Sequence, residues 1–340
     1  MNPTEKFPKS MFEPVDIDKE KSEAIAKPSL TFMQDAWRRL KKNKGAVFSL
    51  YVLVLLTLLA LFGPYINEYT LESQNTARAN LPPKIPLLEN IDWLPFDGKV
   101  ERYGNDVDLY EQKEIDEYFW FGTDALGRDI FTRVWEGTKI SLYIAFLAAF
   151  IDMVIGVVYG GISAYYGGKV DNIMQRIIEV LVGIPILIVV ILMILILKPG
   201  IISITIALTI TGWTGMARVI RGQVLKLKNQ EYVLASKTLG AENNRVIMKH
   251  LLPNLAGVII INTMFTIPNA IFFEAFLSFI GLGLQSPYAS LGTLIEDGYK
   301  SMQIFPHILI FPAVILSIVM ICFNLLADGL RDAFDPKMRD

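Results

Sequence analysis

Six long apolar stretches constrain this chain more than any other feature of its sequence. A helix needs about 20 apolar residues to cross a bilayer, and stretches of this kind recur along the 340 residues. They are Ala46–Ile66, Ile140–Tyr165, Ile177–Leu197, Gly200–Ala217, Leu255–Phe273 and Ile304–Leu326. Because backbone groups in lipid must bond within their own segment, each stretch predicts a helix and not an open sheet. The sequence therefore predicts an all-α, polytopic membrane protein with six spans.

The overall composition agrees with a membrane protein. Apolar residues make up 52% of the chain and charged residues 19%, whereas soluble domains average about 25% charged residues. The formal net charge is −2, so no basic excess indicates a nucleic-acid partner. Cys322 is the only cysteine, and His250 and His307 are the only histidines. Neither an intrachain disulfide nor a His/Cys metal site is expected.

Charge in the connections predicts the orientation, since cytoplasmic segments carry an excess of Lys and Arg. The segment before the first span is basic, and Arg218–Pro253 holds seven basic residues against two acidic ones. Asn67–Lys139 instead holds 15 acidic and 8 basic residues, and it is longer than ordinary loops. Both termini are therefore expected in the cytoplasm, and Asn67–Lys139 and Glu274–Phe305 outside.

These features divide the chain into five parts. The first 30 residues are polar and contain no signal-peptide pattern, which predicts a disordered cytoplasmic tail. Leu30–Lys44 fits an interfacial helix and, equally well, a simple positive flank for the first span. The predicted parts are residues 1–45 (tail and interfacial helix), 46–66 (first span), 67–136 (a small irregular extracytoplasmic lobe), 137–328 (transmembrane domain, with a cytoplasmic loop at 226–253) and 329–340 (cytoplasmic tail).

Polar residues and prolines within the spans are the candidates for a translocation path or gate. They are Asp152, Asn262, Pro268 and Glu274. Ionisable residues in a membrane usually face a protein interior or an aqueous cavity, although a hydrogen bond between helices explains Asp152, and Glu179 near a span end, at least as well. Prolines at 185 and 268 are expected to interrupt the third and fifth spans. The spacing of Gly156 and Gly160 favours close helix contact.

Motifs of several enzyme classes are missing. Neither Gly-Lys pair, at Gly98 and at Gly168, is followed by the Ser or Thr of a P-loop. The patterns His-Glu-x-x-His and Gly-x-Ser-x-Gly do not occur either. The chain is therefore not expected to hydrolyse ATP by a P-loop or to carry out these hydrolytic reactions.

The connection from Glu231 to Pro253 has the pattern of two short helices. They are predicted at Tyr232–Leu239 and Asn243–His250, with Gly240 ending the first. Proline suits the first turn of the span that follows. A basic amphipathic loop that lies on the membrane is the alternative interpretation.

A small face on the first of these helices is the candidate contact surface for another protein. It is formed by Ala235 and Ser236, with Tyr232 and Leu239 on either side. Small side chains allow a second surface to approach closely.

The same connection resembles the "EAA" signature of ABC importer permeases, in which a coupling helix docks into a groove of the ATPase subunit. Gly240 is followed thirteen residues later by Pro253. The family's glutamate position holds Leu234, and Glu231, one turn earlier, is the candidate substitute charge. The residues that the resemblance assigns to coupling are Glu231, Leu234, Ala235, Ser236, Leu239, Gly240, Leu252 and Pro253.

Further blocks resemble the C-type permease of oligopeptide and dipeptide importers. They are Phe121–Asp129, Tyr165–Asp171, Glu274–Gly283 and Asn324–Asp332, the last followed by Asp335-Pro336. They occur in the family's order and, with the coupling signature, cover about two thirds of the chain. The stretch Asn67–Trp120 has no counterpart among them.

The resemblance implies the fold of a type I (MetI-like) ABC importer core in a bacterial cell membrane. It implies a homologous second permease, two ABC ATPase subunits that hold ATP and Mg, and an extracytoplasmic peptide-binding protein as partners, with no cofactor on this chain. Other substrates within the family, a nickel complex or a peptide antibiotic, stay open. A stand-alone secondary transporter is the rival from another class, although that class is built from two related halves. A membrane scaffold without transport is disfavoured by the polar span residues.

Overall fold

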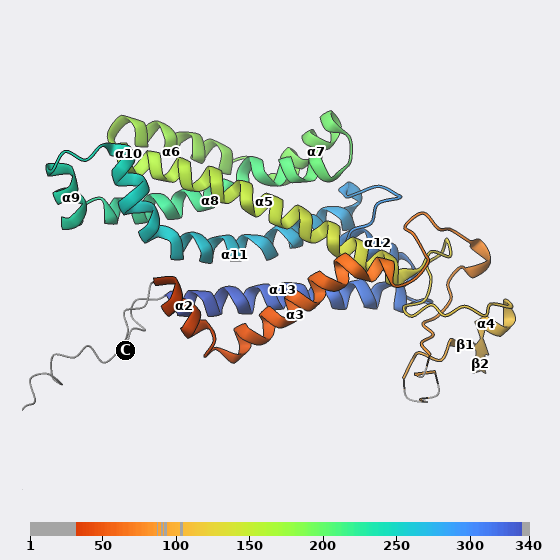
Figure 1. Cartoon of the computed structure of the whole chain (residues 1–340). Coiled ribbons are helices and arrows are strands. Elements are labelled where there is room, and N and C mark those ends of the chain that lie inside the picture. The colour runs from red at the N-terminus through yellow and green to blue at the C-terminus, as the bar shows by residue number, and fades with distance from the viewer. Residues whose placement is uncertain (1–31, 87, 90, 92–93, 103–104, 335–340) are drawn as a thin grey trace, which may run out of the picture.

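The computed structural model describes residues 32–334, except for 87, 90, 92–93 and 103–104. The predicted N-terminal tail up to residue 31, and the block at Asp335-Pro336, lie outside these residues. The described chain is an elongated bundle of helices with a loop-rich lobe at one end (Figure 1). Its helices are α2 (Phe32–Leu40), α3 (Lys44–Phe62), α4 (Leu109–Gln112), α5 (Ile130–Tyr166), α6 (Gly168–Val182), α7 (Ile186–Leu197), α8 (Ile201–Leu227), α9 (Glu231–Thr238), α10 (Asn243–Val246), α11 (Leu252–Leu277), α12 (Leu291–Ser301) and α13 (His307–Phe334).

Five stretches of helix are long and apolar enough to cross a membrane, and they contain α3, α5, α8, α11 and α13. The third predicted span differs, because α6 and α7 meet at 80° and make up a sixth span only if this bent pair crosses as one. Pro185 has no N–H to continue the helix, and its ψ of 128° turns the chain out of helical geometry. The interruption predicted at Pro185 is therefore confirmed, and the third predicted span corresponds to this bent pair.

Helix ends and one proline also differ from the predictions. Helix α11 continues through Pro268, so the interruption expected there does not occur. Neighbouring groups in a membrane protein allow proline inside a helix. Helices α5 and α8 extend beyond their apolar stretches, the first starting at Ile130 and the second ending at Leu227. Polar residues end an apolar stretch but do not end a helix.

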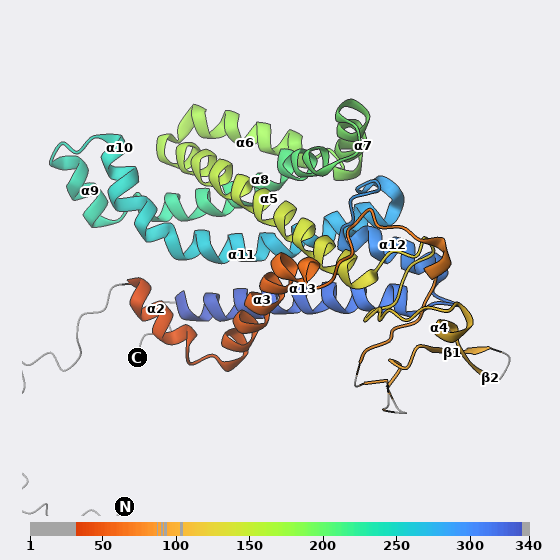
Figure 2. The same ribbon diagram turned by 45° about the vertical axis from the view of Figure 1, so that its right-hand side comes forward.

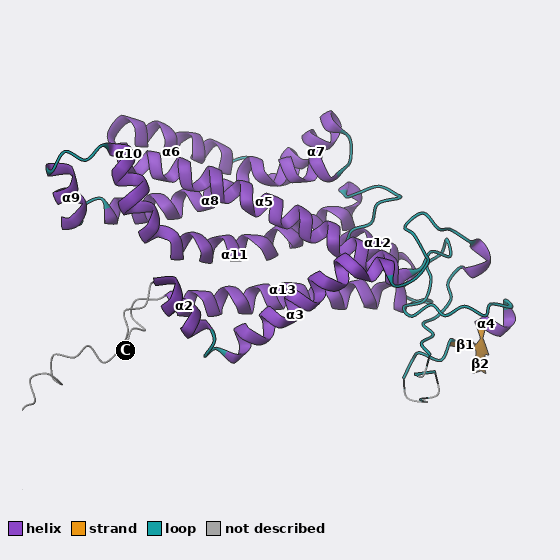
Figure 3. Cartoon of the chain, in the orientation of Figure 1, coloured by secondary structure: helices purple, strands orange, loops and turns teal. Residues whose placement is uncertain are grey.

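The segments that connect the helices lie at the two ends of the bundle, grouped as their charges predict. Helices α2, α9 and α10 lie at one end together with the last turns of α13 (Figures 1 and 2). The lobe and α12 lie at the opposite end in both views. Figure 3 shows that the lobe is mostly loop, apart from the hairpin of β1 (Lys99–Arg102) and β2 (Asn105–Asp108), the short α4 and a 3-10 turn at Thr76–Arg78. Which end faces the cytoplasm stays a prediction.

Helices α5 and α8 pack so closely that two glycines are required between them. A Cβ atom on Gly156 would lie within 2.6 Å of the Met216 Cβ, and one on Gly160 would collide with the Ala217 carbonyl oxygen. The close contact predicted from the spacing of these two glycines is therefore confirmed. It holds α5 and α8 together along the halves of the two helices that lie nearer α9.

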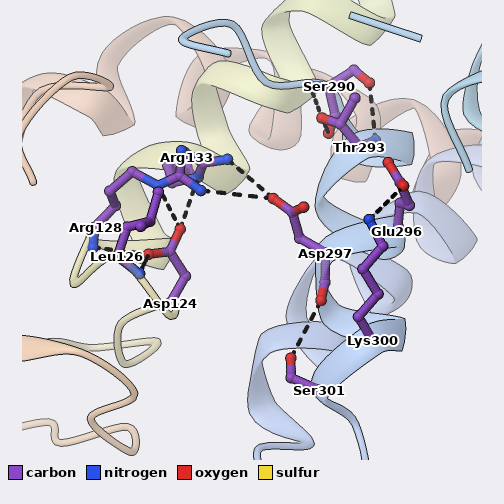
Figure 4. Close-up of polar contacts among 10 residues, drawn as sticks. All are labelled: Asp124, Leu126, Arg128, Arg133, Ser290, Thr293, Glu296, Asp297, Lys300 and Ser301. Atoms are coloured by element: carbon purple, nitrogen blue, oxygen red, sulfur yellow. Dashed lines mark hydrogen bonds and ion pairs between the residues drawn. The ribbon is translucent and has the colours of Figure 1, made fainter. Parts of the chain in front are cut away.

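An ion cluster joins the start of α5 to α12 at the lobe end (Figure 4). Arg128 Nε donates to Asp124 Oδ2 at 2.6 Å, and Arg133 Nε lies 3.7 Å from the same oxygen. Both arginines also lie within 3.7 Å of Asp297 Oδ2. Burial raises the pKa of the Asp297 carboxyl, and the two guanidinium groups oppose that rise. The cluster fixes the lobe-end segment before α5 against α12.

Helix α5 begins just inside this cluster, where Asp129 caps it. Asp129 Oδ2 accepts hydrogen bonds from Thr132 N and from Asn67 Nδ2, both at 2.8 Å. Burial raises the pKa of the Asp129 carboxyl, and these bonds oppose the rise. The cap explains why α5 starts ten residues before the apolar stretch that predicted it.

Removing one arginine from the ion cluster is expected to destabilise the protein strongly. Breaking a buried ion pair costs about 3–5 kcal/mol because a charge is left without its partner. We expect Arg133→Ala to lower the thermal unfolding midpoint of the detergent-purified protein by several degrees, read from tryptophan fluorescence. Lys300→Ala is the matched control, since its pair with Glu296 is largely exposed and such pairs contribute about 0–1 kcal/mol. Equal midpoints for the two variants would contradict a structural role for the cluster.

The orientation is testable by cysteine labelling in a Cys322→Ala background. Asp116 in the lobe and Arg245 in α10 are both exposed, and the lobe and α10 lie at opposite ends of the bundle. We expect a membrane-impermeant maleimide to label Asp116→Cys in intact cells, and to label Arg245→Cys only after the membrane is permeabilised. Labelling of Arg245→Cys in intact cells would reverse the predicted orientation.

Candidate functional site

The predicted coupling segment forms a short helix that projects from one end of the bundle. Helix α9 begins at Glu231 and ends at Thr238, within one residue of the prediction. Val233 is fully buried, and it packs in a cluster with Ile220 and Val224 of α8. Glu231 lies in the first turn, where a negative charge is favourable. A single buried side chain thus seats α9 while most of its surface stays free.

Gly240 ends α9 through its backbone conformation, as the sequence predicts. Its φ is +84°, and a Cβ added there would have no neighbour within 4 Å. The N–H of Ala241 donates to the Ser236 carbonyl at 3.1 Å, and the N–H of Gly240 donates to the Lys237 carbonyl at 2.9 Å. Glycine is needed here for its left-handed conformation and not for lack of space.

The exposed surface of α9 is more apolar than the small face expected from the sequence. Leu239 is 88% exposed, and Leu234 and Tyr232 are exposed as well. Ala235 belongs to this surface. Ser236 does not, because it is half-buried and its Oγ lies 3.3 Å from His250 Nε2. Exposed apolar side chains grouped on a projecting helix are typical of a protein contact surface.

The second limb of the loop is continuous with α11. The helix predicted at Asn243–His250 ends as α10 at Val246, and a π-helical turn at Ile247–Leu251 leads directly into α11. Leu252 and Pro253 are the first two residues of α11, which confirms the predicted place of the proline in a first turn. Movement of this limb is therefore movement of the start of α11.

Contacts that the sequence does not reveal tie the loop to the ends of α5 and α8. Tyr165 Oη donates to Asn243 Oδ1 at 2.7 Å, and Lys237 Nζ lies 4.6 Å from the centre of the Tyr165 ring. Lys228 Nζ donates to the Ala164 carbonyl at 2.7 Å. Tyr165 lies in one of the family-like blocks, but nothing in the local sequence indicates its partners.

A bidentate ion pair links α6 to α8 beside these contacts. Arg221 Nε and Nη2 donate to the two carboxylate oxygens of Asp171 at 2.7 and 2.6 Å. Ser163 on α5 donates to the same carboxylate at 2.5 Å. Sequence reasoning counted Arg221 only as one positive charge among seven. The pair joins three helices at the end of the bundle that carries α9.

A groove of about 370 Å³ lies between α5, α8 and α11, and it contains two of the candidate path residues. Asp152 is only 5% exposed, and its Oδ1 has no hydrogen-bond partner among the described residues. Asn262 lines the same groove from α11. The carboxylate of Asp152 presses so closely on Gly212 that a Cβ there would collide with it. The structure thus brings Asp152 and Asn262 to one cavity.

The other two path candidates lie elsewhere. Glu274 is completely buried, and it accepts hydrogen bonds from Ser141 and Ser278, both at 2.8 Å. Pro268 is buried within α11 and is not among the residues that line the groove. Glu274 therefore forms an interhelical hydrogen bond, which is the kind of bond that was one explanation for Asp152. Glu179 forms an exposed pair with Arg176 at 2.6 Å.

Comparisons with known proteins match this chain over nearly its whole length. A family model described as "Binding-protein-dependent transport system inner membrane component" matches residues 154–340, and "N-terminal TM domain of oligopeptide transport permease C" matches residues 31–83. The dipeptide transport system permease protein DppC of Bacillus subtilis is 47% identical over 320 residues, which cover 94% of this chain and 90% of that protein. The oligopeptide transport system permease protein OppC of the same organism is 44% identical over 333 residues, with 98% and 99% covered.

A more distant relative, and a solved structure of similar shape, were also found. The OppC protein of Escherichia coli is 36% identical, with 94% of this chain and 95% of that protein covered. Among solved structures, a chain of the inward-facing MetNI methionine ABC transporter superposes with a TM-score of 0.49 at 19% identity, covering 58% of this chain and 94% of that chain. The protein therefore belongs to the family of binding-protein-dependent transport system inner membrane components, which are transport permeases and not catalytic subunits, in the branch that contains OppC and DppC.

Proposed function

We propose that this chain is the C-type permease subunit of an ATP-driven importer of oligopeptides or dipeptides. The names of its relatives support the substrate class, since they transport dipeptides or oligopeptides. The observation that carries the coupling role is the exposed apolar surface of α9, which ends at the left-handed Gly240. A nickel complex or a peptide antibiotic is the alternative cargo. The family match disfavours a stand-alone secondary transporter.

The proposed assembly has four further proteins. A homologous second permease supplies the other half of the translocation path, and two ABC ATPase subunits bind ATP and Mg at the cytoplasmic end. An extracytoplasmic peptide-binding protein delivers the cargo at the lobe end. This chain binds no cofactor and no nucleic acid, and both of its termini lie in the cytoplasm of a bacterial cell.

The contacts around α9 support a mechanical route from the ATPase to the path. Val233 seats α9 against α8, and Tyr165 joins the end of α5 to Asn243. Helices α5 and α8 also form two walls of the groove that holds Asp152. When the ATPase pair closes on ATP, the docked α9 moves, and these contacts transmit the movement to the walls of the groove. The groove then opens toward the outside, as alternating access requires.

Substitutions in α9 are expected to uncouple transport without disturbing membrane insertion. A β-branched residue at a left-handed position costs about 1–3 kcal/mol, and a loss of 1.4 kcal/mol in docking is a factor of about ten in affinity. We therefore expect Gly240→Val and Ala235→Arg each to reduce peptide uptake by about tenfold or more. The measurements are peptide uptake by cells and retention of the ATPase subunits on the tagged permease.

Asn229→Arg is the matched control for the added charge, because Asn229 is exposed and lies just outside α9. It should retain both uptake and the ATPase subunits. Normal uptake together with normal ATPase retention in both α9 variants would remove α9 as the coupling element.

A further inference from the structure

The groove between α5, α8 and α11 has an unusual chemical lining. Among the described residues that line it, Asp152 carries the only charge, and no Lys or Arg faces it. Its other polar side chains are those of Asn262, Thr266 and Asn269, all on α11. The remaining walls are apolar or glycine. The carboxylate of Asp152 thus lies in a mostly apolar groove. A low-dielectric environment of this kind strengthens the attraction of a carboxylate for a positively charged group.

The groove offers a ligand several hydrogen-bond acceptors. Asn262 Nδ2 donates to the Val258 carbonyl at 2.8 Å, and Thr266 Oγ1 donates to the Asn262 carbonyl at 3.0 Å. These bonds use one of the two N–H donors of Asn262 and the hydroxyl donor of Thr266, and the side-chain oxygens of both residues can still accept hydrogen bonds. Asp152 Oδ1 has no partner among the described residues, although the side chain is almost fully buried. Burying an ionised carboxylate without a partner is costly, and a cation beside it would offset that cost.

The rim of the groove gives a ligand access to this carboxylate. Gly212 and Gly215 of α8 are both exposed and both line the groove. A Cβ on Gly215 would meet no atom within 4 Å, so this part of the rim is open. Gly212 instead lies directly against the carboxylate. With no side chain at either position, a peptide backbone can come close to Asp152.

We propose that Asp152, with Asn262 and Thr266, forms a binding site for an ammonium group of the cargo on its way through the permease. An ammonium has three N–H donors and no acceptor, which complements a carboxylate beside two neutral oxygens. Charge-assisted bonds of this kind are about twice as strong as neutral ones. Peptides present this group at their N-terminus and on lysine side chains. This inference rests on the proposed function. It adds that the translocation path prefers cargo that carries a positive charge.

The test measures protection of the groove in the complete, detergent-purified transporter complex. Gly215→Cys in a Cys322→Ala background places a thiol on the open rim, and the rate of maleimide labelling of this chain is read by mass spectrometry. Three probes separate the chemistry: trialanine amide carries only an α-ammonium, N-acetyl-lysine amide carries only a side-chain ammonium, and N-acetyl-trialanine amide carries neither. We expect half-protection by the ammonium probes at about tenfold lower concentration than by the neutral probe, or lower still.

Variants of the site connect this protection to the carboxylate. Asp152→Asn keeps the shape of the side chain and should remove the difference between charged and neutral probes. Gly212→Ala keeps the charge but crowds the carboxylate, and it should reduce the difference. Glu179→Gln is the matched control, since Glu179 is an exposed carboxylate in the bent pair α6–α7, paired with Arg176 away from the groove. It should leave protection unchanged.

Three outcomes would overturn the proposal. They are equal protection by charged and neutral probes, an unchanged preference in Asp152→Asn, and no labelling of Gly215→Cys without any probe, which would mean that another subunit fills the groove. Uptake of labelled trialanine by the reconstituted wild-type complex with ATP and its binding protein is measured separately. A complex that shows charge-dependent protection but imports no peptide would contradict the proposed function and leave the ammonium site standing.

Discussion

The close approach of α5 and α8 is the contact on which the rest of this structure depends. It requires glycine at 156 and 160, because atoms of Met216 and of the Ala217 backbone on α8 occupy the space of a side chain. Small residues let membrane helices pack where lipid provides no hydrophobic driving force. The two helices then emerge together beside α9, where Lys228 bonds the Ala164 carbonyl. The same pair forms two walls of the groove at Asp152. One packing contact thus positions both the coupling loop and the groove.

The two buried carboxylates show why a membrane sequence predicts a functional site only in part. Asp152 and Glu274 have similar local sequences, because both are acidic residues within or near the ends of apolar stretches. Their roles differ because Ser141 and Ser278 satisfy Glu274, whereas no described group satisfies the Asp152 Oδ1. Ser141 lies 133 residues away in the chain, so no local pattern indicates the bond. A carboxylate with its partners within the fold is structural, whereas Asp152 lines the groove and has no such partner at Oδ1.

The accuracy of the sequence predictions follows the range of the interactions involved. Apolar length is a local property, and five of the six spans follow from it. The turn at Gly240 is local too, since it depends on one residue's backbone. The two prolines differ although both lie in apolar stretches: the chain bends at Pro185 and continues as a helix at Pro268. The tertiary surroundings decide between these outcomes. The bond from Tyr165 to Asn243 likewise joins residues 78 positions apart and leaves no local trace.

Helix α5 connects all the functional regions because of its length. Its 37 residues correspond to about 55 Å at 1.5 Å per residue. One end touches the coupling loop through Tyr165, and the other carries Arg133 in the ion cluster. Between them lie Asp152 and, nearer the lobe end, Ser141, which bonds Glu274 of α11. A displacement applied at Tyr165 is therefore resisted at the lobe end by buried polar bonds. At the groove, Asp152 Oδ1 has no partner among the described residues, so this carboxylate does not tie α5 to α11 there as Ser141 does near the lobe.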